Sequence, residues 1–306
     1  MDGGIDDALA LILALKSPEL KVLGITAVSG NVPVEQATLN ALRVVELLNR
    51  PDVWVAQGAT RPLAREPIRA FSFHGKDGLG DSNLPIAKIH ATKETALGKI
   101  NETISSSSGS DMTLICTGPL TNIASLIKDF PDVIGMIEEI IIMGGAFGLT
   151  KYGMGNETPS AEFNIYSDPE AAKVVFESRV RLKAVGLDVT TVPRLELVKS
   201  DYSRIAKKRN RVSQFAARIL QTNIQHHGRF TLHDPMAVAA KIWPALYKFK
   251  SYSVNVETKG EYTTGMTVAD RRAKSEMGQD LGQSVQVCEA VDPRFKRRFL
   301  ERLTAN

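Results

Sequence analysis

Short runs of β-branched and apolar residues alternate with longer runs of helical spacing, and this alternation constrains the fold most strongly. Strands are expected at residues 21–28, 53–56, 112–116, 139–143 and 183–187. Helices are expected near them, at residues 7–15, 34–48, 120–128 and 169–177. This order is typical of a mainly parallel sheet with helices on both faces. The sequence therefore predicts an open α/β fold in which ligands bind beyond the carboxyl ends of the strands.

The rest of the chain shows no sign of a second domain. Residues beyond 195 have helical spacing to about residue 242, strands are expected at 252–256 and 284–287, and a last helix follows Pro293. No composition shift marks a linker and no internal repeat is present. We therefore expect a single domain over residues 1–306.

Charge and composition exclude several classes of partner. The net charge of +4 is mild, and the basic runs at 207–211 and 296–298 are typical of solvated helix faces rather than a nucleic-acid site. No stretch reaches the roughly 20 apolar residues of a membrane span, and no signal-peptide pattern opens the chain. The two cysteines, Cys116 and Cys288, lie in apolar runs and are expected to be buried free thiols. These features favour a cytoplasmic protein.

Two acidic clusters stand far apart in the sequence. Asp2, Asp6 and Asp7 surround a Gly-Gly turn, and Asp234 lies between His233 and Pro235. Each cluster also suits the capping of a helix that follows it. If the fold brings the clusters together, however, the carboxylates form a site for a hard cation beside one imidazole. Such a site suits the activation of a water molecule.

Other polar residues follow or lie between the predicted elements. The segment from Thr117 to Asn122 follows a strand and is compatible with a simple turn. Glu162 and Asn164 would share one face of an extended segment, where they would suit a polyhydroxylated ligand. His74 lies in a Gly-rich loop that lacks the GK[ST] ending of a phosphate-binding loop.

Several segments together resemble the inosine–uridine-preferring nucleoside hydrolase family. They occur in the family's order between residues 2 and about 240: DGGIDDALA, VSGN, HGKDGLG, CTGPLTN, MGGAF, AEFNIYSDPEAA and HDPMAVA. The resemblance implies an open α/β fold with a mostly parallel sheet, a bound calcium ion, and hydrolysis of the N-glycosidic bond of ribonucleosides. It also implies a homodimer or homotetramer.

The resemblance assigns a role to each matching position. Asp2 would be the base that activates water and also lie at the metal, and His233 would be the acid for the leaving base. Calcium would be bound by Asp7 and Asp234, and by the backbone carbonyl of Thr117. The ribose would be held by Asp6, Asn156, Glu162 and Asn164, with Asn31 and Met143 lining its pocket and His74 near the nucleobase.

The chain departs from the family pattern at its first residues. The family has an apolar strand that runs into D-x-D-x-G-x-D-D, whereas Met1 occupies the x before Asp2, so the first Asp and its strand are lacking. We expect unpaired backbone groups and lost apolar contacts in the centre of the sheet. Gly3 stands where the family usually has Pro, which should loosen the turn.

Three functions are therefore compared. The first is a calcium-dependent hydrolase of the inosine and uridine type. The second is a catalytically impaired relative that binds a nucleoside or a partner subunit. The third is a magnesium-dependent phosphatase, which requires a Lys or Arg near Asp2, and none is adjacent in the sequence. The preference for purines or pyrimidines is left open.

Overall fold

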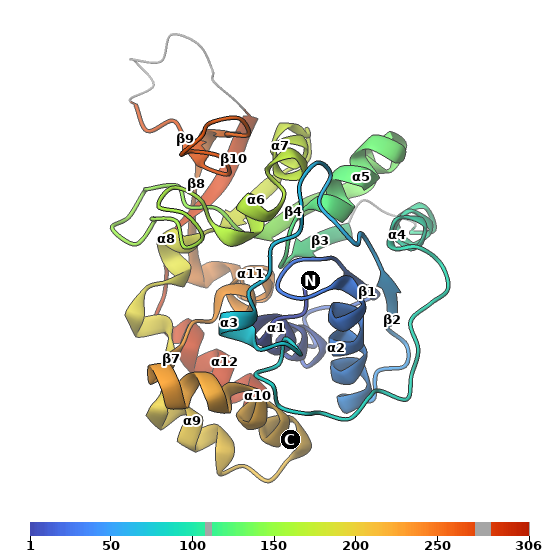
Figure 1. Cartoon of the computed structure of the whole chain (residues 1–306), viewed down its shortest axis with the longest axis vertical. Helices are drawn as coiled ribbons and strands as arrows, with labels where there is room; N and C mark the ends of the chain where they lie inside the picture. Colours follow the sequence, from blue (N-terminus) through green and yellow to red (C-terminus); the bar gives the residue numbers. More distant parts are fainter. Residues whose placement is uncertain (108–111, 273–282, 306) are drawn as a thin grey trace.

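A six-stranded sheet forms the centre of the computed structural model, which describes residues 1–107, 112–272 and 283–305. The strands lie in the order β3 (Met112–Cys116), β4 (Ile137–Met143), β5 (Leu182–Val185), β10 (Gln283–Val291), β8 (Tyr247–Val256) and β9 (Thr267–Ala269) (Figure 1). The first four are parallel, and β8 and β9 are antiparallel to their neighbours. The predicted mostly parallel sheet is thus confirmed.

Two short parallel strands lie beside this sheet without pairing to it. They are β1 (Gly24–Ala27) and β2 (Trp54–Gln57), which form a separate two-stranded sheet. A third small sheet pairs β6 (Leu197–Val198) with β7 (Arg229–Phe230). The interruption falls between β1 and β3, with the amino terminus between them (Figure 1). The described strands thus form three separate sheets.

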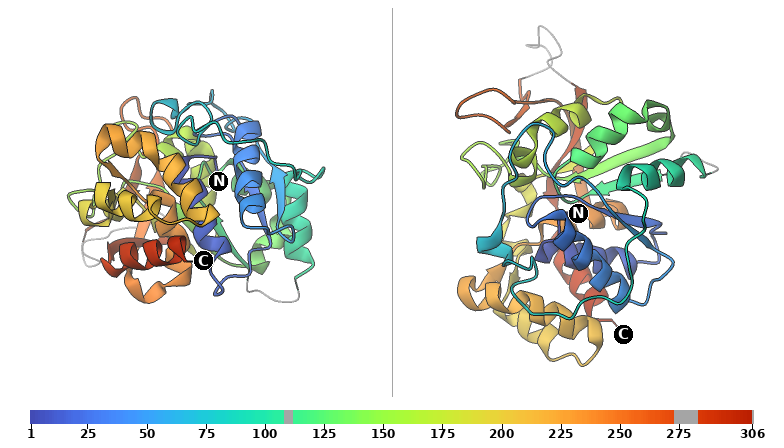
Figure 2. Two further views of the ribbon diagram at one scale, coloured as in Figure 1. Left: turned by 90° about the horizontal axis from the view of Figure 1, so that it is seen from below. Right: turned by 45° about the vertical axis from the view of Figure 1, so that its right-hand side comes forward.

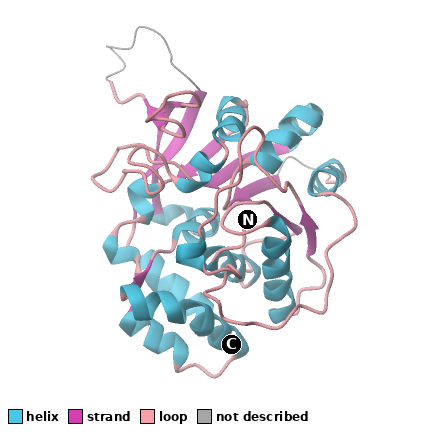
Figure 3. Cartoon of the chain, viewed as in Figure 1, coloured by secondary structure: helices cyan, strands magenta, loops and turns pink. Residues whose placement is uncertain are grey.

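Helices cover both faces of the sheet, as predicted (Figures 1 and 3). On one face α1 (Ile5–Leu15) and α11 (His233–Ile242) pack against each other and α11 contacts β4, while α5 (Thr121–Asp129) and α7 (Pro169–Glu177) lie on the other. Figure 2 shows α10 (Arg211–His227) and α12 (Arg294–Thr304) as neighbours farther from the sheet. The other α-helices are α2 (Val34–Leu47), α3 (Phe71–His74), α4 (Ala96–Ser105), α6 (Phe163–Ser167), α8 (Leu187–Thr190) and α9 (Lys199–Ala206). Three 3-10 helices, η1 (Pro131–Met136), η2 (Pro193–Leu195) and η3 (Pro244–Leu246), complete the described part.

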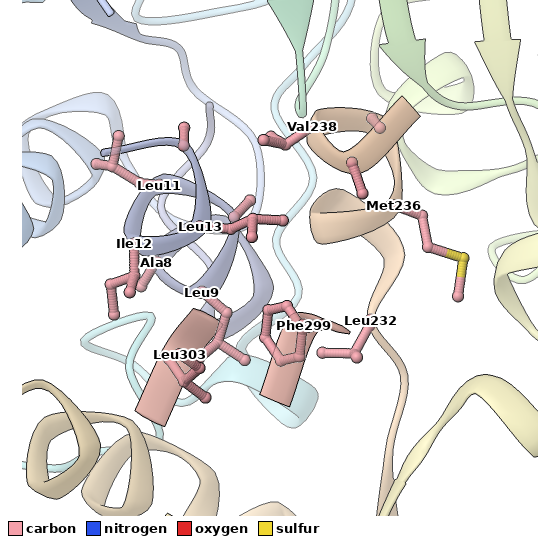
Figure 4. Packing of buried hydrophobic residues seen from close by; sticks show 14 of the residues in the cluster. Ala8, Leu9, Leu11, Ile12, Leu13, Leu232, Met236, Val238, Phe299 and Leu303 are labelled. Atoms are coloured by element: carbon pink, nitrogen blue, oxygen red, sulfur yellow. The ribbon is translucent and has the colours of Figure 1, made fainter. Parts of the chain in front are cut away.

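Helix α1 is buried along its whole length, which explains its unusual sequence. Every residue from Ile5 to Leu15 is buried, and nine of the eleven are apolar. In Figure 4, Leu13 points toward Val238 of α11 and Leu9 toward Phe299 of α12. A helix that is apolar all round belongs in a core. The two exceptions, Asp6 and Asp7, therefore require a specific reason to be buried.

Local sequence signals fixed some elements more accurately than others. The strand at 112–116 and the helix at 169–177 begin and end where predicted, and Asp168 caps α7 by accepting a hydrogen bond from Ala171 N at 3.0 Å. The strand expected to reach residue 187 ends at Val185, because Gly186 caps the short helix α8. Cys288 is buried as predicted, whereas Cys116 is only partly buried because it borders the gap beside β3. None of the described helices has the length and apolar character of a membrane-crossing segment.

Candidate active site

Three buried carboxylates converge where the first turns of α1 and α11 meet. Asp6, Asp7 and Asp234 each offer an oxygen, and these oxygens lie within 4.8 Å of one another. All three residues are at least 95% buried. The packing of α1 against α11 thus brings together the two acidic clusters that the sequence holds more than 200 residues apart. The sequence prediction that they form one site agrees with this geometry.

The Gly-Gly turn makes the approach of the first cluster possible. Gly3 has φ of +83°, and a Cβ there would lie 2.6 Å from Ala37 Cα. A side chain at this position is therefore excluded both by conformation and by space. Next to it, Gly4 N donates to Asp7 Oδ2 at 2.8 Å, and Asp2 N donates to Asp7 Oδ1 at 3.3 Å. The turn thereby orients Asp7 into the site.

The cluster holds more negative charge than its own hydrogen bonds can stabilise. Burial and the charge of Asp7 raise the pKa of Asp6 to about 8. Burial and the neighbouring aspartates raise the pKa of Asp234 well above its usual value. Among the described residues, Asp6 Oδ1 has no hydrogen-bond partner. Because buried polar atoms are nearly always paired, this orphan oxygen in an all-oxygen site fits a hard cation such as calcium.

Thr117 joins the cluster from the carboxyl end of β3. Its hydroxyl donates to Asp7 Oδ1 at 2.7 Å, across 110 residues of sequence. This contact places Thr117 beside the three carboxylates, where the sequence resemblance expects its backbone carbonyl to contribute to a metal site.

Asp2 lies next to the three clustered carboxylates but is not one of them. Its Oδ2 accepts from Asn31 N at 2.7 Å and its Oδ1 accepts from Asn31 Nδ2 at 3.0 Å. Burial and the charge of Asp7 raise the pKa of Asp2 well above its usual value. A Cβ on Gly30 would come within 2.0 Å of Asp2 Oδ2, so the neighbouring backbone can hold Asp2 this closely only because Gly30 lacks a side chain. Asp2 is thus a fixed carboxylate with an enhanced affinity for protons.

Two imidazoles border the cluster. His74 Nδ1 accepts from Ile5 N at 3.1 Å and lies 3.9 Å from Asp6 Oδ1. His233 Nδ1 lies 2.8 Å from Thr190 Oγ1. Burial lowers the pKa of His74 to about 3, with a contribution from His233, and burial lowers the pKa of His233 to about 4. Both rings are therefore neutral at neutral pH, and they contribute hydrogen bonds to the site.

A second group of predicted residues lies at the carboxyl end of β4, the strand next to β3. Asn164 Nδ2 donates to Met143 O at 3.1 Å, and Glu162 accepts from the backbone N of Gly145, Asn164 and Ile165. The expected extended conformation of this segment is wrong, because Glu162 is the N-cap of α6 and Asn164 lies inside that helix. The side chain of Asn156 is exposed, and its Oδ1 accepts from Phe163 N at 3.0 Å. Met143, Glu162 and Asn164 thus form a buried group of their own, with Asn156 at its outer side.

Two further residues, Thr190 and Arg69, escaped the sequence analysis, whereas Asp188 is the polar residue expected at a strand end. Thr190 contacts His233, and Asp188 accepts hydrogen bonds from the backbone N of Phe147, Leu149 and Thr150. Both follow β5, so the rule that ligands bind at strand ends was the available signal. Arg69 is close enough to Asp2 for the two charges to interact, and it donates to Gly30 O at 3.2 Å. Arg69 is thus a basic residue near Asp2 in space, although no Lys or Arg is adjacent to Asp2 in the sequence.

Known proteins are similar to this chain both in sequence and in fold. The chain is 42% identical over 276 residues to the pyrimidine-specific ribonucleoside hydrolase RihA of Salmonella agona (strain SL483), covering 88% of this chain and 86% of the relative. Among solved structures, the plant nucleoside hydrolase PpNRh1 superposes with a TM-score of 0.91 at 30% identity, covering 100% of this chain and 98% of that one. The purine-preferring ribonucleoside hydrolase from Gardnerella vaginalis superposes with a TM-score of 0.88 at 32% identity, covering 99% and 96%. A family model, described as inosine-uridine preferring nucleoside hydrolase, matches residues 1–297, and the chain accordingly belongs to that family of N-ribosyl hydrolases.

Proposed function

We propose that this protein hydrolyses the N-glycosidic bond of ribonucleosides to ribose and free base, with a calcium ion held where Asp6, Asp7 and Asp234 converge. The resemblance assigns Asp6 to the ribose, and Asp7, Asp234 and the Thr117 carbonyl to calcium. We place Asp6 at the ion as well, because its Oδ1 has no hydrogen-bond partner among the described residues. The observation that carries the proposal is the convergence of these three buried carboxylates within 4.8 Å. Their oxygens offer the donor chemistry that calcium prefers. When bound, calcium would supply positive charge that orients a water molecule and lowers its pKa.

Asp2 is suited to act as the general base. Its carboxylate is held by two hydrogen bonds from Asn31, and its pKa is raised by burial and by Asp7. A general base works best when its pKa lies near the pH at which the enzyme operates. Asp2 would therefore accept the proton of the attacking water while its position stays fixed.

The carboxylates also suit the charge that develops on the sugar. Cleavage of a glycosidic bond passes through an oxocarbenium-like state. Negative side chains in a site that excludes water stabilise such a cation more strongly than they would in water. Glu162 and Asn164, fixed at the amino end of α6, are assigned to the ribose hydroxyls, and Asn31 and Met143 to the walls of the sugar pocket.

His233 is assigned to the leaving base. With a pKa of about 4, its ring is neutral at neutral pH, so it would act by donating a hydrogen bond from Nε2 to the departing base. This requires the proton to reside on Nε2, which a hydrogen bond donated by Thr190 to Nδ1 favours. His74, in contact with Asp6 and close to His233, is assigned to the base side of the pocket.

The similarity to pyrimidine-specific relatives supports uridine as a substrate. Identity to the Salmonella agona protein is 42%, against 32% to the purine-preferring protein from Gardnerella vaginalis. We accordingly place uridine before inosine among the substrates of the inosine and uridine type.

The test is the release of ribose from uridine and inosine, with calcium and with excess chelator. Turnover that disappears in chelator and returns with calcium is expected. Full activity in excess chelator would contradict the metal assignment, while binding of nucleoside without turnover would support the impaired relative. Release of phosphate from a phosphomonoester in magnesium would support the phosphatase.

A further inference from the structure

Asn40 is a fully buried polar residue in the middle of α2. Its Nδ2 donates to Gly3 O at 2.8 Å and to Asp77 O at 2.8 Å. Its Oδ1 accepts from Gln36 Nε2 at 2.9 Å and from Arg43 Nη1 at 2.8 Å. An amide side chain has two donor and two acceptor positions, and here all four are occupied. These four partners fix the amide in one orientation.

The two backbone carbonyls that Asn40 binds belong to opposite sides of the candidate active site. Gly3 lies in the turn directly after Asp2, and Asp77 lies in the loop that begins at His74. The two carbonyls are far apart in the sequence, yet a single amide group reaches both. Asn40 therefore joins the turn that holds the proposed base to the loop that carries the imidazole assigned to the nucleobase side.

The loop of residues 74–81 is braced by its own hydrogen bonds. Asp77 Oδ1 accepts from Asp81 N at 2.9 Å, and Asp81 Oδ1 accepts from Asp77 N at 3.2 Å. A Cβ on Gly78 would lie 2.4 Å from Gly3 O, so the loop lies directly against the turn. Because the loop is closed on itself, loss of the hydrogen bond at the Asp77 carbonyl would displace it as one piece.

Glu46, farther along α2, binds a later part of the same connecting segment. Its Oε1 accepts from Lys88 N at 2.8 Å. Asn40 and Glu46 thus both attach this segment to α2 through backbone hydrogen bonds. Within the described part of the chain, the hydrogen bonds of Asn40 extend to the turn at Gly3, whereas that of Glu46 does not.

We propose that Asn40 is a positioning residue for hydrolysis, which sets the turn of Asp2 against the loop of His74. The inference rests on the proposed function, in which Asp2 activates water and His74 lies on the side of the nucleobase. Water and the departing base must both lie close to the same sugar carbon, so the separation of the two segments matters for the rate. A misplacement of about 1 Å can cost about 100-fold in rate.

Hydrogen exchange tests the positioning without reference to activity. Asn40→Leu gives a side chain of similar shape that donates no hydrogen bond, so both carbonyls lose their donor. Exchange should become about tenfold faster over residues 1–8 and over residues 74–81 together. Glu46→Ala is the matched control, since it frees the same connecting segment but leaves both hydrogen bonds of Asn40 in place. It should leave exchange unchanged over these two ranges.

Steady-state kinetics then separate positioning from general loss of structure. Asn40→Leu should lower kcat for uridine by about 100-fold and change KM by less than about threefold, because the ribose contacts assigned to Glu162 and Asn164 remain. The Glu46→Ala control should keep both constants within about twofold of the wild type. Asn40→Ser leaves room for a bridging water, so it should show smaller effects of the same kind, and it replaces the Leu variant if that variant does not fold.

Two results would overturn the proposal. The first is faster exchange at only one of the two ranges, or at neither, in the folded Asn40 variants. The second is a wild-type kcat in a variant whose exchange is faster at both ranges. If the wild type itself releases no ribose, the proposed function fails, and the exchange result alone decides whether Asn40 couples the turn to the loop.

Discussion

Asp2 is the residue on which the proposed chemistry depends most directly. Asp2 is not one of the three clustered carboxylates, yet it is fully buried and accepts two hydrogen bonds from Asn31. A residue that only bound the metal would not need this separate support. Its fixed position beside Asp7 fits a group that removes a proton.

Substitution of Asp2→Asn should separate catalysis from folding. The amide keeps the size of the side chain, and Asn31 can reorient to retain one hydrogen bond, so the fold should persist. Loss of the base should lower kcat for uridine by roughly 100-fold or more. Steady-state assays measure kcat, and circular dichroism measures whether the fold persists. A folded variant with the wild-type kcat would show that Asp2 is not the general base.

Thr190 should act through the ring that it contacts. Thr190→Val removes the hydroxyl at 2.8 Å from His233 Nδ1 but keeps the side-chain shape, so it frees the ring to adopt the other tautomer. We expect kcat for inosine to fall by about tenfold with little change in KM. Thr190→Ser, which retains the hydroxyl, is the matched control. If the Val and Ser variants are equally active, the hydrogen bond has no such role.

At the scale of elements, each strand end contributes one part of the site. Thr117 follows β3, Met143 ends β4, and Thr190 follows β5 on the short helix α8. The carboxyl ends of β3 and β4 could be predicted from sequence because β-branched runs stop at polar or Gly-rich segments, whereas the predicted end of β5 was two residues too late. Helix α8 could not, since its four residues carry no helical period, and Thr190 was therefore missed. Glu162 was placed in an extended segment for a similar reason, because its capping role appears only when α6 forms.

Asp168 is a buried carboxylate to which we assign a structural role and no catalytic role. It caps α7 through Ala171 N and also accepts from Leu63 N and Thr121 Oγ1. Asp168→Ala should lower the free energy of unfolding by about 1–3 kcal/mol, because three donors lose their acceptor. Urea denaturation measures this loss. The kcat of the folded variant should be unchanged, and a large fall in kcat with unchanged stability would show that the assignment is wrong.

At the scale of the whole molecule, the buried carboxylates link stability to pH and to calcium. The pKa of Asp6 rises from 3.8 in the unfolded chain to about 8 in the fold, so the folded state binds a proton that the unfolded state releases. This contribution to stability is fully present below pH 3.8 and is lost as the pH rises through about 8. In chelator, the Tm should therefore fall between pH 5 and pH 8.

Calcium should reverse this trend, because it stabilises the ionised carboxylates that repel one another without it. The increase of Tm on adding calcium should be larger at pH 8 than at pH 5, as measured by differential scanning calorimetry. Asp6→Asn is the matched control and should reduce the pH dependence in chelator, part of which remains because the pKa values of Asp2 and Asp234 are also raised. A Tm in chelator that rises steadily over this range would contradict the buried, unpaired state of Asp6.

The most direct test is calcium binding by isothermal titration calorimetry, with Asp234→Asn beside the wild type. The two acidic clusters meet only in the folded chain, so removing one charge from the downstream cluster should abolish measurable binding while circular dichroism stays unchanged. The wild type should bind one calcium ion per chain. Equal affinity in both proteins, or no binding by the wild type, would contradict a calcium site built from Asp6, Asp7 and Asp234.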